Sequence, residues 1–193
     1  MNHSLCGPAS TRRRRRGYTL IELIVAVGLF ALIMTLASGA YLVMIGVNRN
    51  TQAVSTGINN LAFALESMTR TIRTGTSYHC ESSSGGNCSS GGTSFFVTDQ
   101  TGVLVSYSRS VSDSVCHSGG NGCLVVTRNG TTIALTSPAL NVSSLVFYGT
   151  GVFTGDGAQA RVTIVVSGTV LEGPGKTQPF TVETGATMRG TDL

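Results

Sequence analysis

The sequence is poor in charge and lacks the short motifs that mark common enzyme classes. Asp, Glu, Lys and Arg together make up 11% of its 193 residues, and the chain has three histidines. It has no Gly-x-Ser-x-Gly elbow, no His-Glu-x-x-His, no phosphate-binding loop of P-loop spacing and no Cys-x-x-Cys. The carboxylates are scattered, several of them beside turn residues, and nothing selects a pair for acid–base catalysis. We therefore expect a protein that is not an enzyme, with no catalytic residue, metal or cofactor.

One long segment lacks charge altogether. Leu23–Val47 carries no charged residue and is long enough to cross a bilayer as a helix. Arg12–Arg16 precede it, which predicts a cytoplasmic N-terminus and an exported remainder. A secretory signal peptide would have a shorter apolar region, and Ser38–Ala40 is only a weak cleavage site for one. A plain signal anchor explains the arginines but not the single Gly17 that follows them.

The residues around that glycine resemble the leader of type IV prepilins and pseudopilins. The matching string is the arginine run, Gly17 and then Tyr-Thr-Leu-Ile-Glu, ending at Glu22. The resemblance implies that a prepilin peptidase cuts between Gly17 and Tyr18 and that Tyr18 is then N-methylated. It also implies that Glu22 is the acid used in filament assembly, with Thr19 beside it in the same segment. Tyr18 stands where Phe or Met is commoner, and Gly39 where many major pilins have a kinking proline.

A charge argument gives Glu22 its role. Cleavage would create a positive amine at Tyr18, at a helix N-terminus whose dipole disfavours a cation. A carboxylate from a neighbouring subunit can neutralise it, since two charges about 4 Å apart attract by about 4 kcal/mol at an effective dielectric near 20. The alternative is a stray acid at the membrane interface, but acids in such segments are costly and rarely accidental.

Removal of the leader changes the charge balance. The whole chain is +4, but without the leader eight basic residues face nine acidic ones, a formal net charge of −1. The high sequence pI is therefore no indication of a nucleic-acid surface, and we expect nucleic acid not to be a partner. The expected divisions are a leader at 1–17, a transmembrane and assembly helix at 18–47, an amphipathic helix at 48–75 and a disulfide-containing β head at 76–193.

Helical periodicity continues beyond the apolar run. Apolar residues recur every three or four positions on one face, which is typical of a helix packed on a core: Val54, Ile58, Leu61, Leu65, Met68 and Ile72. Joined to the apolar run, this stripe predicts one nearly continuous helix from Thr19 to Arg73. Gly39, Gly46 and Gly57 are its expected points of bending.

The remainder predicts an antiparallel, mostly meandering sheet that wraps the second half of this helix, giving an α+β fold. Turn signals separate segments rich in Val, Ile, Phe and Thr, which we expect to be the strands 93–98, 103–108, 123–128, 131–136, 142–148, 160–170 and 179–184. Asn129-Gly130 is a strong two-residue hairpin signal. The order of these pieces resembles J-type minor pseudopilins and W-type minor pilins.

Four cysteines remain after the leader, which contains Cys6. An exported location favours disulfides, and the Gly/Ser-rich tracts around each pair favour the local pairings Cys80–Cys88 and Cys116–Cys123 over a crossed arrangement. A metal site is the alternative, because a histidine adjoins one cysteine of each pair. The cysteine spacings do not fit the close pairs of zinc sites.

Three kinds of function are compatible with these features. The resemblance favours a structural subunit, a minor pilin or pseudopilin of a type IV pilus or type II secretion-like filament. Its partners would be prepilin peptidase, other pilin-like subunits and an inner-membrane assembly platform, and it would span the inner membrane once with its C-terminal domain outside the cytoplasm. The alternatives are a membrane-anchored binding ectodomain (an adhesin or DNA-uptake receptor) and an anchored enzyme. The sequence does not select among secretion, twitching, adhesion and DNA uptake.

Overall fold

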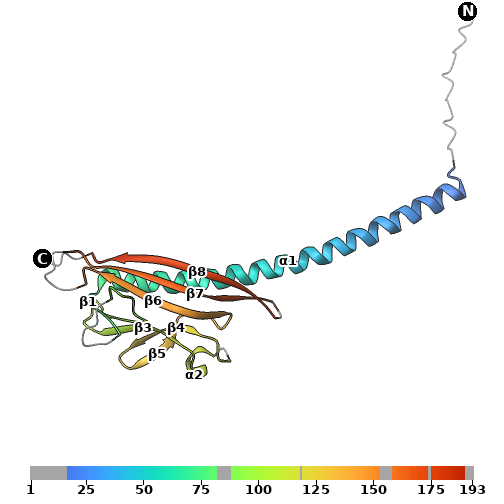
Figure 1. Ribbon diagram of the computed structural model, residues 1–193. Coiled ribbons are helices and arrows are strands. Elements are labelled where there is room, and N and C mark those ends of the chain that lie inside the picture. The colour runs from blue at the N-terminus through green and yellow to red at the C-terminus, as the bar shows by residue number, and fades with distance from the viewer. Residues whose placement is uncertain (1–16, 82–87, 118, 153–157, 174, 190–193) are drawn as a thin grey trace, which may run out of the picture. The chain divides into compact units, whose positions relative to one another are not determined.

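A computed structural model describes residues 17–81, 88–117, 119–152, 158–173 and 175–189. Within these residues the architecture is α+β, a long N-terminal helix followed by antiparallel sheets (Figure 1). The arginine run, Cys6 and most of the first Gly/Ser tract lie outside the described residues. The chain divides into two compact units, residues 1–46 and 47–193, and the second unit is called the head below.

Helix α1 spans Leu20–Thr74. Each end of α1 differs by one residue from the helix predicted from Thr19 to Arg73. Its first part is long and apolar enough to cross a membrane, and it is the one described helix with that property. The large apolar side chains from Leu20 to Val47 are exposed, apart from the partly buried Ile45. Inside the head, α1 buries one face, formed by Gly57, Leu61, Ala64, Leu65, Met68 and Ile72. The change from exposed to buried apolar residues follows the change from a continuous apolar run to a stripe.

The head contains a five-stranded meander in the order β1-β2-β3-β4-β5. Its strands are β1 Thr76–Cys80, β2 Ser94–Thr98, β3 Leu104–Ser110, β4 Cys123–Arg128 and β5 Thr131–Ala134. A short helix, α2 Asp113–Cys116, lies between β3 and β4. The β4–β5 hairpin turns at Asn129 and Gly130, which both have positive φ, as a two-residue turn of this type requires.

A second sheet of three strands has the order β6-β7-β8. Its strands are β6 Leu140–Thr150, β7 Arg161–Gly173 and β8 Lys176–Thr187, and all pairings are antiparallel. In Figure 1, β7 and β8 run alongside the head portion of α1. Strand β6 is joined to the first sheet by backbone hydrogen bonds, both ways between Gly92 and Phe147 and from Val142 N–H to the Gly122 carbonyl.

One apolar core joins α1 to both sheets. Its fully buried members come from all three layers and include Met68 of α1, Phe95 of β2, Phe147 of β6 and Ile164 of β7. Phe95 stacks between Tyr78 and Phe147, with ring centroids 6.0 and 5.2 Å away. The buried faces of β2, β3, β6 and β7 alternate with exposed residues, which is the period of a sheet with one face on a core.

Two expectations about the sheets need correction. The prediction of a single sheet was wrong, because the strands after Ser137-Pro138 form a sheet of their own. Strand β1 was also missed, since Thr-Ser-Tyr-His-Cys contains no Val, Ile or Phe and offers only Tyr78 and Cys80 as alternating apolar residues. It pairs with β2 through a register shift, and Ser77 has a φ of 55° there. A bulged edge strand of this kind is specified by its partner and by Tyr78 and Cys80 entering the core, not by its own propensity.

Candidate functional site

The start of α1 is built by Thr19 and Glu22. The Glu22 backbone N–H donates to the Thr19 hydroxyl oxygen at 3.3 Å, and the Leu23 N–H donates to the Thr19 carbonyl at 3.2 Å. Thr19 is therefore the N-cap, and the Thr-x-x-Glu spacing is that of a capping box. The side chain of Glu22 sits in the first helical turn, where the helix dipole favours a negative charge.

This carboxylate stands among exposed apolar side chains. Its neighbours Leu20, Ile21 and Leu23 are 76%, 71% and 61% exposed, and Tyr18 before them is exposed as well. An apolar surface of this extent is unsuited to water and indicates burial in lipid or against other helices. Gly17, Tyr18 and Glu22 thus lie close together at the start of the helix, and each is exposed among the described residues. Cleavage and methylation at these positions remain predictions.

Both disulfides of the head are local. Cys80 is bonded to Cys88 and Cys116 to Cys123, the pairings that the Gly/Ser tracts favoured. The first bridge lies inside the main core, with both cysteines fully buried. The second belongs to a small separate cluster with Val125, under α2. With all four cysteines oxidised, the head offers no thiolate for the alternative metal site.

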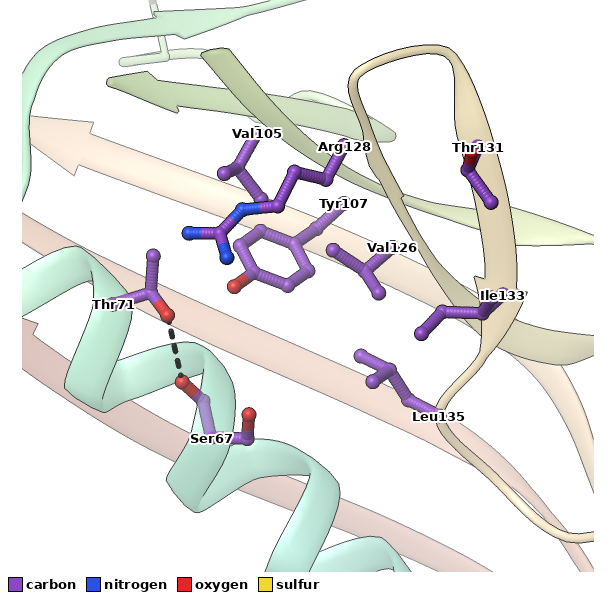
Figure 2. Close-up of a pocket in the computed structure, with 9 residues that line it drawn as sticks. All are labelled: Ser67, Thr71, Val105, Tyr107, Val126, Arg128, Thr131, Ile133 and Leu135. Atoms are coloured by element: carbon purple, nitrogen blue, oxygen red, sulfur yellow. Dashed lines mark hydrogen bonds between the residues drawn. The ribbon is translucent and has the colours of Figure 1, made fainter. Parts of the chain in front are cut away.

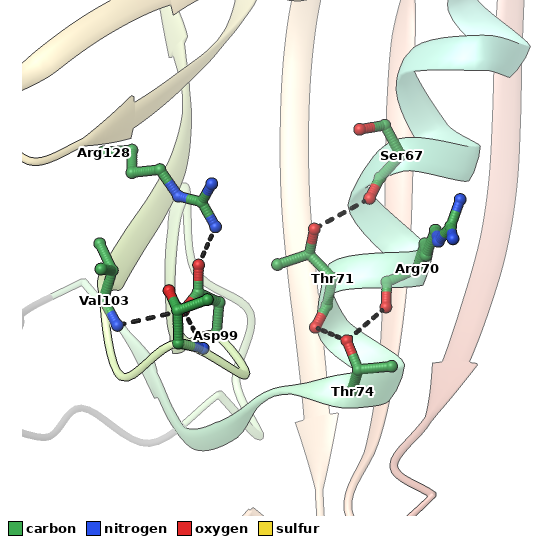
Figure 3. A network of polar contacts seen from close by, with 8 residues as sticks. Ser67, Arg70, Thr71, Thr74, Asp99, Val103 and Arg128 are labelled. Carbon is green, nitrogen blue, oxygen red and sulfur yellow. Dashed lines mark hydrogen bonds and ion pairs between the residues drawn. The ribbon is translucent and has the colours of Figure 1, made fainter.

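A polar network lies where β2 ends and β3 begins (Figure 3). Asp99 is nearly buried, and its Oδ1 accepts hydrogen bonds from the Thr101 N–H at 2.8 Å, the Thr101 hydroxyl at 2.6 Å and the Val103 N–H at 3.1 Å. Its Oδ2 is ion-paired with the guanidinium of Arg128 at the end of β4. Through its hydrogen bonds Asp99 shapes the turn between β2 and β3. Its ion pair with Arg128 comes from the pairing of β3 with β4.

A groove of about 410 Å³ runs between α1 and the β4–β5 hairpin (Figure 2). Ser67 and Thr71 line its helix side, Tyr107 points its hydroxyl towards the helix, and Val126 and Ile133 line the hairpin side. Burial raises the pKa of Tyr107, and a hydrogen bond with Thr71 acts in the opposite direction. The groove was not foreseen, because it exists only where β4 and β5 extend beyond the face that α1 covers.

A family model supports the interpretation of the N-terminus. The model for the prokaryotic N-terminal methylation motif matches residues 12–38. No curated protein and no solved structure matches the chain. The matched motif, the long apolar helix and the antiparallel sheets are together consistent with a type IV pilin-like protein. The motif implies processing by a prepilin peptidase and a single-pass membrane anchor, as the resemblance in the sequence predicted.

Proposed function

We propose that this chain is a structural subunit, a minor pilin or pseudopilin, of a type IV pilus or type II secretion-like filament. The observation that carries the proposal is the exposed Glu22 in the first turn of an exposed apolar helix, directly after the matched cleavage motif. An isolated anchor gains nothing from an acid at this depth, whereas a filament made of such helices needs one per subunit. The order of head strands supports placement among J-type pseudopilins or W-type minor pilins.

The proposed assembly step is a charge pairing between subunits. Prepilin peptidase releases the amine of Tyr18, which the dipole of its own helix disfavours. Glu22 of an adjacent subunit neutralises that amine within the bundle of apolar helices. Once water is excluded, separating the two charges costs about 3–5 kcal/mol, because each would be left buried and unpaired. Insertion beside a mature subunit is thereby favoured over remaining free in the membrane.

The proposed location follows from the order of the segments. The chain spans the inner membrane once before assembly, with its arginine leader in the cytoplasm and its head outside. An oxidising compartment is consistent with the two disulfides of the head. Other pilin-like subunits and the inner-membrane assembly platform are the proposed partners.

Coexpression with a prepilin peptidase tests the proposal. We expect mass spectrometry of the purified protein to show an N-terminus at Tyr18 carrying one methyl group. A Gly17→Val variant is the matched control, because a branched side chain at the cut should leave the leader attached while the membrane segment is unchanged. A wild-type protein that keeps its arginines in the presence of active peptidase would instead identify a plain anchor.

A further inference from the structure

Half of the basic residues that follow the leader gather at one end of the head. Arg70 and Arg128 line a hollow of about 270 Å³, and Arg73 and Arg189 line a second one of about 330 Å³. The two hollows share Thr74 and Gln100, so they are neighbours at the C-terminal end of α1. The backbone N–H of Arg189 donates to the carbonyl of Arg73 at 3.0 Å. This bond joins the end of α1 to the segment that follows β8. We call Arg70, Arg73, Arg128 and Arg189 the arginine end.

Capping of α1 does not require these guanidinium groups. Helix ends leave carbonyls without partners, and arginine side chains can supply them. Here the hydroxyl of Tyr78 donates to the carbonyls of Ile72 and Gly75, each at 2.7 Å. The Thr74 hydroxyl donates to the Arg70 carbonyl at 3.1 Å, and the backbone N–H of Arg189 donates to the Arg73 carbonyl. The Ile72 and Arg73 carbonyls of the last turn therefore have partners other than charged side chains.

Among the described residues, no carboxylate lines the hollow of Arg73 and Arg189, whereas Asp99 lines the hollow of Arg70 and Arg128 and is ion-paired with Arg128. Over the described ranges the structure has one ion pair, Arg128 with Asp99, and the other three side chains of the arginine end are exposed. Glu66 stands one turn before Arg70 without an ion pair to it. Asp192 follows in the sequence and lies outside the described residues. Exposed charges of one sign that lie near one another raise the local positive potential and attract anions.

Contrary to the expectation drawn from the net charge of −1 without the leader, we propose that the arginine end binds the phosphodiester backbone of a nucleic acid. Guanidinium groups match phosphate oxygens in bidentate geometry, and all four cations here are arginines. The Gln100 amide and the Thr76 hydroxyl, which line the same hollows, are further donors of the kind that contact phosphates. Because the charged donors of the arginine end are of the kind that contact phosphate, we expect binding that is independent of base sequence. The inference does not rest on the proposed filament.

The salt dependence of DNA binding tests this proposal. The probe is a fluorescein-labelled duplex, and the readout is anisotropy with the full-length protein in a neutral detergent. Three phosphate contacts give a slope near −2.7 in log–log salt plots, or about a 40-fold loss of affinity between roughly 50 and 200 mM salt. The double variant R70Q/R73Q retains about one contact, and its affinity should fall only about 3- to 4-fold over the same range.

A charge-matched control separates a site from net charge. R49Q/K176Q removes the same two charges elsewhere in the head, and Arg49 is about 30 Å along α1 from Arg70. We expect this control to keep the wild-type slope. The single variant R189Q, at a different backbone segment, should lower the slope by about one. Absence of binding by the wild type at about 50 mM salt, or an equal loss in the control, would overturn the proposal.

Discussion

At the scale of single residues, Glu22 has the most specific expectation attached to it. Glu22→Ala removes a carboxylate but leaves the apolar helix and the Thr19 cap, so export and cleavage should be unchanged. Incorporation into filaments should be lost, because each unpaired amine in the bundle costs about 3–5 kcal/mol. Quantitative immunoblotting of sheared filaments against the membrane fraction measures the effect.

The control for Glu22 lies further along the same helix. Glu66→Ala removes an equally exposed acid from α1 within the head, and we expect its incorporation to match the wild type. Equal incorporation of both variants would contradict the charge-pairing step, while leaving the peptidase cut untouched.

Tyr107 provides a test of burial in the head. Its pKa is raised by burial above the usual 10.0, so the folded state holds the phenol proton more tightly than the unfolded state does. The stabilisation is complete below about pH 10 and is lost as the pH rises through the raised pKa. We expect Tyr107→Phe to be less stable than the wild type at about pH 8, since it loses a hydrogen bond worth about 1 kcal/mol.

Urea unfolding at two pH values measures this dependence. The stability difference between the wild type and Tyr107→Phe should shrink at about pH 10.5, because only the wild type loses the contribution of the protonated phenol. Tyr148→Phe removes a hydroxyl from a side chain that is 44% exposed and serves as the control. A difference that stays constant with pH would show that the hydroxyl of Tyr107 is not desolvated.

At the scale of elements, α1 approaches β7 closely at Gly57. A Cβ atom there would lie 2.6 Å from Cγ1 of Val170 and 3.7 Å from Cδ2 of Leu140. The low helix propensity of glycine suggested that Gly57 is a point of bending, but its position on the buried face of α1 gives it a packing role. Glycine here lets the helix backbone rest on the sheet, at a cost of about 1 kcal/mol in helix propensity.

Gly57→Ala should therefore destabilise the head although alanine is the better helix former. Overpacking of about 1–3 kcal/mol exceeds the propensity gain, so we expect a net loss of about 1 kcal/mol in the free energy of unfolding. Adding Val170→Ala should recover part of the Gly57→Ala loss, which a double-mutant cycle by urea unfolding would show. Gly46→Ala, which meets nothing within 4 Å, should leave the unfolding of the head unchanged.

At the scale of the whole molecule, the two disulfides close loops of similar length in different surroundings. The separations are 8 and 7 residues, so each bridge is worth about 2–3 kcal/mol in the chain-entropy model. Cys80 and Cys88 lie in the core that joins α1 to both sheets, while Cys116 and Cys123 lie in a small cluster beneath α2. The protein is thus expected to depend unequally on them.

Paired substitutions measure that difference. C80A/C88A should lower the free energy of unfolding by about 1 kcal/mol more than C116A/C123A, since it also leaves a cavity in the main core. Thermal unfolding of both variants beside the wild type provides the comparison. Equal losses would show that only loop closure matters and that the core repacks around the missing sulfurs.

The N-terminal half was predictable from the sequence because its information is local. The spacing of Gly17, Glu22 and the uncharged run identifies the N-terminal motif. The apolar stripe from Val54 to Ile72 predicts the second part of helix α1. The Asn129-Gly130 hairpin and the local cysteine pairs are also short-range features. Local rules of capping, periodicity and turn geometry suffice for such elements, since neighbours in sequence are neighbours in space.

Tertiary structure decided which distant segments meet. It divided the strands into two sheets, recruited Thr76–Cys80 as a bulged edge strand and opened the groove beneath the β4–β5 hairpin. It also brought Arg189 to Arg73, a contact between residues more than a hundred positions apart that no local pattern predicts. Strand pairing and burial over long separations depend on the whole core, because one strand is compatible with several partners until packing against α1 selects among them.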